Sequence, residues 1–477
     1  MSEGSSSMIG RIGVGVTPVR SILSVASVFV VVALVAILRS PEILLHGRFW
    51  AEEGTMWWAN ARASNALETL LYVPDLAGYF MLNTNVSFVI AGIFPLQYQP
   101  LVVTWLAVLT MATPAMVYLC VSRSHPTIWR VVVTLFMMVG APLLEPEVFS
   151  NAINAQVFLG LGAALILVYD DESHAPRRSL LAFLMLAGLS GMYAAILAPL
   201  FVLKALSDKP TRTFTEMEPA STGSPSTGTR LRVIGNHWAQ AGVMSLCLII
   251  QLTVFMYQRS SGKVYSTKAT KLPSIQDLPV FAESNFHSLL GNRDGATAVL
   301  TSGLPSPTRT VLIGAVLTSF VMLAIAEVVQ QLRKRFVQTH KTVSPPSGDY
   351  SDQSITYLVL SYLLVSAFVL VGFADSYPHS RYQVLATSIL GLCVLEMARR
   401  IRANRMVSTV FVVLVFALST ASGIRDDQRN FITCDASACM PWADQVRAVS
   451  DGSRDGYQFW PFSGPWIVSV SELTADE

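Results

Sequence analysis

The chain has 477 residues, of which 52% are hydrophobic and only 13% are charged. Soluble proteins carry about twice that share of charged residues, and several apolar runs here reach the roughly 20 residues that a helix needs to cross a bilayer. The composition therefore predicts an all-α polytopic membrane protein. The net charge of +2 is too small to build a domain-sized basic face, which argues against a nucleic-acid partner.

The first 100 residues are predicted to form a cytoplasmic end, one span and one outer loop. Residues 1–20 are rich in Gly and Ser and are predicted to be disordered. The apolar run 21–38 is predicted as a retained first span, because no small-residue cleavage site follows it. In the outer loop 39–100, residues 55–76 are predicted to form a helix that lies on the membrane. Residues 78–94 are long enough to span, but amides interrupt them and need partners in hydrocarbon, so we expect an interfacial or re-entrant helix.

The Lys and Arg residues decide how the later helices are oriented. The positive-inside rule places such residues in cytoplasmic loops and here favours about 11 spans, with the N-terminus inside and the C-terminus outside. The run 180–204 counts as two short helices that meet at Gly188–Tyr193. The other spans after the first are predicted at about 101–121, 130–144, 152–169, 238–257, 310–329, 355–373, 383–398 and 406–421.

This arrangement divides the chain into two membrane modules and a tail. The first module covers 21–205, and a cytoplasmic linker covers 206–237. The second module covers 238–421 and contains a further outer loop at 258–308. The extracytoplasmic tail 422–477 is too rich in aromatic residues for a disordered extension, so it is predicted to be a small cap on the outer membrane surface.

The stretch Arg48–Gly54 is the first candidate site. Glu52 and Glu53 follow one another just beyond the first span, in the company of tryptophans, which prefer the membrane interface. Carboxylates in such a position are expensive unless they are solvated or paired, and they are often functional. The alternative is a solvated turn after a helix.

The second candidate site is the loop before the fourth span. Asn151, Asn154 and, less well aligned, Glu147 are spaced to share one helix face, and Gln156 follows within the span. The alternative is a helix N-cap, in which a side chain of the loop accepts a backbone N–H.

Two further outer segments are candidates. The glycines of Gly188–Tyr193 allow a close approach to a ligand, although a plain helix break is the alternative. Before the tenth span lie His379, Arg381 and Tyr382. A guanidinium at a helix N-terminus suits phosphate recognition, and the alternative is an arginine that reaches out to lipid headgroups.

These residue types indicate group transfer from a lipid-linked phosphate. A phosphate leaving group needs positive charge more than a protonating acid, so one carboxylate suffices as the general base. A hydrolase would usually need a second, acidic carboxyl within about 10 Å. Glu52 and Glu53 are not expected to fill both roles, because adjacent side chains of an extended chain point apart. Glu52, Glu53 and Glu147 would hold Mg²⁺ or Mn²⁺ only if they converge in space.

The cysteines give no zinc-like spacing with histidines. Three of the five lie in apolar runs, where a thiol is usually a small core residue. Cys434 and Cys439 lie in the tail and would be able to form a disulfide outside the cytoplasm.

The motifs and their order resemble the GT-C class of integral membrane glycosyltransferases. Arg48–Gly54 is similar to the "RFFAEDG"-like first-loop motif of a group of bacterial members, and Glu147–Phe158 is similar to their second motif, "gE…N…N.qW". Here Val157 stands at the usual aromatic position and Phe158 follows it. The resemblance covers roughly residues 20–205, and the C-terminal third only in layout.

The resemblance implies a GT-C-like fold with an interfacial helix in the first outer loop. It also implies an inverting enzyme of the bacterial plasma membrane that uses polyprenyl-phosphate sugar donors on the extracytoplasmic face. Glu53 aligns with the aspartate of the family and is the expected base, with Glu52 beside it. Glutamate lengthens the reach by one methylene where aspartate is common.

We therefore expect a glycosyltransferase that acts on an envelope glycan or glycolipid acceptor. One alternative is a transporter or flippase for a lipid-linked saccharide, which predicts internal repeats and broken helices at the bilayer midplane; the sequence has no convincing repeat. The other is a non-catalytic scaffold that binds a polyprenyl lipid.

Overall fold

The computed structural model describes residues 18–39, 41–75, 78–122, 125–140, 148–170, 177–207, 227–262, 281, 285, 351–372, 380–400, 440–459 and 466–474. The described part is predominantly helical, with one two-stranded antiparallel sheet. The spans predicted at 310–329 and 406–421 lie outside the described residues, and so do Cys434 and Cys439.

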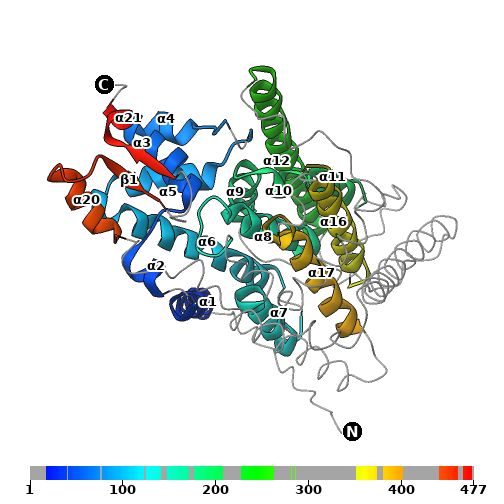
Figure 1. The fold of residues 1–477 in the computed structure, drawn as a ribbon. Coiled ribbons are helices and arrows are strands. Elements are labelled where there is room, and N and C mark those ends of the chain that lie inside the picture. Colours follow the sequence, from blue (N-terminus) through cyan, green and yellow to red (C-terminus); the bar gives the residue numbers. More distant parts are fainter. Residues whose placement is uncertain are drawn as a thin grey trace, which may run out of the picture.

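The elements follow one another in the order shown in Figure 1. In the N-terminal half they are α1 (Pro18–Arg39), α2 (Pro41–His46), the π-helical turn η1 (Glu53–Trp58), α3 (Ala59–Ala63), α4 (Ala66–Leu71), α5 (Leu82–Gly92), the 3₁₀ turn η2 (Leu96–Tyr98), α6 (Gln99–Val121), α7 (Thr127–Val139), α8 (Ala155–Tyr169), α9 (Arg177–Leu189), α10 (Met192–Ala195) and α11 (Ala198–Ser207). They continue with α12 (Thr227–Ser260), α16 (Ser351–Gly372), α17 (Ser380–Arg400), α20 (Trp442–Ser450), β1 (Gly456–Gln458), β2 (Ile467–Ser469) and α21 (Val470–Thr474).

Helix α8 is the centre of the bundle. All of its residues are buried, and it packs against α6, α9, α10, α16 and α17. Its sequence carries no charge and is apolar on every side, which is typical of a helix surrounded by other helices. Gly160 and Gly162 permit close packing, because a Cβ atom on Gly162 would lie 2.5 Å from the ring of Phe183.

Three helical segments are long and apolar enough to cross a membrane: Leu96–Val121, Asn236–Ser260 and Ser354–Val371. The pair Arg178–Leu189 and Met192–Ser207, bent by 120°, would make a fourth span if it crosses as one unit. Among the described residues, α1, α7 and α8 contribute shorter apolar stretches. These helices support an all-α membrane protein, whereas the eleven-span arrangement stays a prediction.

The helix break predicted at Gly188–Tyr193 is present. Helix α9 ends at Leu189 and α10 begins at Met192. Between them Gly191 has a φ of +133°, a conformation that is open almost only to glycine. This single residue makes the sharp turn between the two short helices possible.

The segment 39–100, predicted to be the first outer loop, differs from its predicted form. Residues 55–76 were expected to form one helix, and this expectation is wrong, because the segment divides into η1, α3 and α4. The chain becomes extended at Ser64, and Asn65 starts α4 through a capping box with Glu68, which is a strong local start signal.

Helix α5 agrees with the expectation that 78–94 does not span by itself. Its 11 residues reach only about 16 Å, roughly half of a bilayer core. The amide of Asn85 finds the partners that it needs, since it donates to the carbonyls of Leu70 and Tyr72 and accepts from Trp57 Nε1.

The C-terminal elements lie against this loop. We call residues 440–459 and 466–474 the C-terminal cap; it contains α20, β1, β2 and α21. Figure 1 shows these red and orange elements beside the blue helices α3 to α5. Aromatic side chains form the joint: Trp58 lies 5.5 Å from Trp442 and 5.1 Å from Tyr457, ring centre to ring centre. The described tail therefore forms a small folded unit, while its position on the outer membrane surface stays a prediction.

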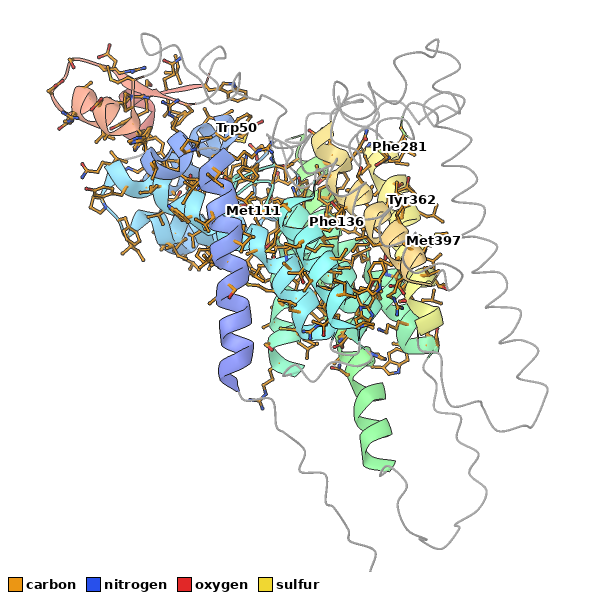
Figure 2. All side chains as sticks on the ribbon, turned by 90° about the horizontal axis from the view of Figure 1, so that it is seen from below. Trp50, Met111, Phe136, Phe281, Tyr362 and Met397 are labelled. Carbon is orange, nitrogen blue, oxygen red and sulfur yellow. The ribbon has the colours of Figure 1, made fainter. Side chains whose placement is uncertain are left out.

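Different parts of the chain form the two ends of the helix bundle. Figure 2 shows α20, Trp50 and Phe281 toward one end, while the first turns of α12 extend at the other. At that other end, the buried Lys204 donates to the carbonyl of Leu167 at 2.7 Å, and Ser354 donates to Glu396 at 3.1 Å. These contacts tie together the helix ends that the positive-inside rule places in the cytoplasm.

The orientation can be tested with single cysteines in a background whose five native cysteines are replaced by alanine. Ser453→Cys lies in the exposed turn of the C-terminal cap and Arg178→Cys lies in the exposed first turn of α9. If the C-terminus is outside, a membrane-impermeant maleimide labels Ser453→Cys in intact cells and Arg178→Cys only after permeabilisation. The reverse pattern would show the opposite orientation.

Candidate functional site

The carboxylate of Glu53 joins the first two candidate segments. One oxygen accepts the backbone N–H of Trp50 at 2.9 Å, and the other accepts the N–H of Ala152 at 2.7 Å, 99 positions along the chain. The side chain is only 3% exposed. The solvated turn considered as an alternative is therefore wrong for Glu53, which is a buried carboxylate at the start of η1.

This environment changes the acidity of the group. Burial raises the pKa of Glu53 to about 7, because the charged form loses its hydration. The N–H groups of Trp50 and Ala152 act against this effect, and the neighbouring Glu52 adds a smaller increase. A carboxyl with this pKa is able to take up and release a proton near neutral pH.

The side chain of Glu52 lies in a different environment. It is half-buried, and no hydrogen bond to its carboxylate occurs in the described part of the chain. The segment is helical rather than extended, so the geometry assumed for Glu52 and Glu53 was wrong. The two carboxylates still point in different directions, because neighbouring side chains on a helix lie about 100° apart.

The second segment is a turn that leads into α8. Because α8 begins only at Ala155, the expectation that Asn151 and Asn154 share a helix face is wrong. Asn151 Oδ1 instead accepts the N–H groups of Ile153 and Asn154, at 2.8 and 3.4 Å, and so closes a turn before the helix. The N-cap position of α8 itself is Asn154, which makes no side-chain capping bond. Ser150 has a φ of +55°, which is unusual for a residue other than glycine. Glu147 lies outside the described residues.

Gln156 connects the second segment to the third. Its Nε2 donates to the hydroxyl of Tyr79 at 3.0 Å, and the side chain is 6% exposed. Its Oε1 lies against Gly191, where a Cβ atom would come within 2.0 Å of it. The glycine is thus required by a neighbouring amide as well as by the backbone turn.

Helices α5 and α12 hold the same junction from outside. The N–H of Asn83 donates to Ser190 Oγ at 2.9 Å. Gln251 of α12 accepts the N–H of Phe80 and donates to the carbonyls of Phe80 and Gly188. Sequence reasoning missed Gln251, although a glutamine in an apolar helix is a signal that a polar partner lies nearby.

The fourth segment meets the third at one hydrogen bond. The hydroxyl of Tyr193 donates to the carbonyl of Tyr382 at 3.1 Å. His379 and the side chain of Arg381 lie outside the described residues. Three contacts therefore bring all four segments together: Glu53 with Ala152, Gln156 with Gly191, and Tyr193 with Tyr382.

Within the described part of the chain, several buried polar atoms at this junction have no hydrogen-bond partner. They are Asn83 Nδ2, Ser150 Oγ, Asn151 Nδ2 and Gln156 Oε1. Both amide atoms of Gln383, one position after Tyr382 and fully buried, are also without a partner. An unsatisfied buried group costs about 1–3 kcal/mol, and such groups often mark a functional region.

The donor chemistry around Glu53 does not suit a metal ion. Both carboxylate oxygens face N–H donors, whose partial positive charge opposes a cation. Within the described ranges, no group of three or more His, Cys, Asp or Glu side chains is placed to hold a metal. Of the two described carboxylates in the first motif, Glu52 is thus better suited than Glu53 to bind Mg²⁺ or Mn²⁺.

The arrangement supplies a buried carboxyl that titrates near neutral pH, a second carboxylate beside it, and amides at the junction of the four segments. No protein-family model matches this chain, and neither a curated protein nor a solved structure matches it. The similarity to the GT-C class remains an expectation drawn from the motifs.

Replacing Gly191 by alanine tests the junction. The substitution forces an L-residue into a φ of +133° and places Cβ on Gln156, so we expect Gly191→Ala to lower the free energy of unfolding by about 3 kcal/mol. Gly242→Ala is the matched control, because its Cβ would meet nothing within 4 Å and should change stability by less than about 1 kcal/mol. Denaturant unfolding in detergent measures both, and equal stabilities would contradict the described geometry.

The pKa of Glu53 predicts how stability depends on pH. The folded pKa lies above the ordinary value of 4.5, so the folded state holds a proton that the unfolded state releases. The contribution of Glu53 to stability is therefore fully present below pH 4.5 and is lost as the pH rises through about 7, by about 3 kcal/mol in total.

The measurement compares the unfolding free energy of the wild type with that of Glu53→Gln between pH 5 and 8. Other titrating groups affect both proteins alike, so the difference between the two curves isolates Glu53. Parallel curves would mean that the carboxyl is not held in a buried site.

Proposed function

We propose that this protein is a membrane glycosyltransferase, inverting and of the GT-C type. It transfers a sugar from a polyprenyl-phosphate donor to an envelope glycan or glycolipid acceptor on the extracytoplasmic face of the bacterial plasma membrane. The observation that carries the proposal is the position of Glu53, a buried carboxyl with a pKa of about 7 that links the first motif to the second.

In this reaction Glu53 takes the proton of an acceptor hydroxyl. The acceptor oxygen forms a bond to the anomeric carbon, and the bond from that carbon to the phosphate oxygen breaks on the opposite face. The configuration inverts and the polyprenyl phosphate leaves. Its negative charge needs cations, for which His379 and Arg381 before the tenth predicted span are the candidates.

The backbone N–H groups at Glu53 favour this role. They fix the direction of the carboxylate, and each oxygen keeps a second lone pair for the substrate proton. Asn151, Asn154, Gln156 and Tyr382 then form the proposed surroundings of donor and acceptor. Glu52 is the second carboxylate and the alternative base.

One observation favours a transporter as the second candidate. The segments Arg178–Leu189 (α9) and Met192–Ser207 (α10 and α11) are bent by 120° and form the kind of discontinuous helix that lines many transport sites. The polar groups at this break are amides and hydroxyls, however, and the described carboxylates of the site lie in the first outer loop. We therefore place transport of a lipid-linked saccharide second.

The deciding experiment measures sugar transfer by the purified protein from a panel of polyprenyl-phosphate sugars to envelope glycan fragments. Glu53→Gln removes the basic oxygen at nearly constant shape, so we expect turnover to fall by roughly 10²–10⁴-fold. In the wild type, activity should rise with pH through about 7, because the base acts only when it is ionised.

Glu52→Gln is the matched control, because it makes the same chemical change one position away. Collapse of Glu52→Gln with an active Glu53→Gln would assign the base to Glu52. A wild type that binds polyprenyl phosphate but transfers no sugar would support the transporter or the scaffold instead.

A further inference from the structure

A ring of the C-terminal cap lies on the backbone of the acidic motif. A Cβ atom on Gly54, the residue after Glu53, would lie 2.0 Å from Cδ1 and 2.2 Å from Cγ of Phe459. Only a residue without a side chain permits this approach. Phe459 itself is 2% exposed, so the contact is fully inside the protein.

The ring of Phe459 is held from several sides. The N–H of Phe459 donates to the carbonyl of Trp466 at 2.8 Å, which ties it to the second strand segment of the cap. Its ring stacks on Trp442 at 5.9 Å and lies 5.6 Å from Trp58. Such aromatic pairs stabilise beyond their buried area, so the ring is a firm surface for the motif.

The cap has its own attachment to the first outer loop. Trp442 is 3% exposed, and its Nε1 donates to the carbonyl of Leu96 at 2.9 Å. Phe49, in the first motif, packs edge-on against Trp442 at 5.3 Å. The cap thus contacts the motif on both sides of Glu52 and Glu53.

The motif is therefore held between two parts of the chain. Glu53 ties it to the turn before α8, and Gly54 rests on the cap. Both residues lie at the start of the π-helical turn η1, a rare conformation that is frequently found at functional sites.

We propose that the C-terminal cap is a positioning element of the site, and that Phe459 sets the place of Glu52 and Glu53 through Gly54. The effect on activity rests on the proposed function, whereas the effect on the Glu53 contacts does not. Phe459 is a positioning residue and touches no substrate in this account.

The test uses the full-length protein and a double-mutant cycle. Gly54→Ala pushes the motif away from the ring, and Phe459→Ala removes the ring. Amide hydrogen exchange of Trp50 and Ala152 reports on the two bonds of Glu53, and we expect each single variant to speed exchange at both amides by at least tenfold. The double variant should be closer to wild type than Gly54→Ala is, because the added methyl group then fits the vacated space.

Transfer activity adds a second readout. A displacement of about 1 Å can cost about 10²-fold in rate, so we expect Gly54→Ala to lower kcat by that factor and the double variant to recover part of it. Gly92→Ala, also in the first outer loop and free of contacts within 4 Å, is the control that should leave both readouts unchanged. Phe459→Leu replaces Phe459→Ala if the latter does not fold.

Wild-type exchange at Trp50 and Ala152 in Gly54→Ala would overturn the proposal, and so would a double variant as disturbed as Gly54→Ala. If the wild type transfers no sugar but the exchange pattern follows the cycle, the positioning role stands and the glycosyltransferase does not.

Discussion

The arrangement of the four candidate segments depends on one buried carboxylate. Glu53 accepts the backbone N–H of Trp50, which is near in the sequence, and that of Ala152, which lies 99 positions along the chain. Desolvation opposes the charged form, while the N–H donors favour it, and the balance leaves the group near its titration point at neutral pH. The same two hydrogen bonds therefore join the segments and tune the acidity.

Around this carboxylate, side chains form hydrogen bonds with backbone N–H and C=O groups that regular helices leave unpaired. Near a bilayer such groups find few waters, so the protein must supply the partners itself. Gln251 forms hydrogen bonds with the backbone of Phe80 and Gly188. Asn85 donates to a carbonyl at the end of α4, and Thr84 donates to the carbonyl of Ala152 at 3.0 Å. Irregular backbone is thus concentrated where the candidate segments meet, while α8 and its neighbours form a plain apolar core.

In the C-terminal cap, packed aromatic rings hold distant parts of the chain together, as hydrogen bonds do around Glu53. Trp442 and Phe459 come from the far end of the sequence, yet they pack on the first outer loop and leave no room for a side chain at Gly54. A long chain separation of this kind is costly in loop entropy, and the aromatic contacts offset it. These contacts join two segments that are about 400 residues apart in the chain.

The sequence by itself determined what depends on composition and local chemistry. Apolar length marked α6, α12 and α16, glycine spacing marked the break before Met192, and the acidic pair and the amides marked the segments that meet. Only the tertiary structure decided the rest, because it depends on contacts between residues far apart. It buried Glu53 while leaving Glu52 half-exposed, placed Asn151 in a turn instead of on a helix, recruited Gln251 and Phe459, and divided the expected surface helix at Ser64. The periodicity of a sequence does not report contacts between residues that are far apart in the chain, such as Glu53 and Ala152, and these contacts fix the site.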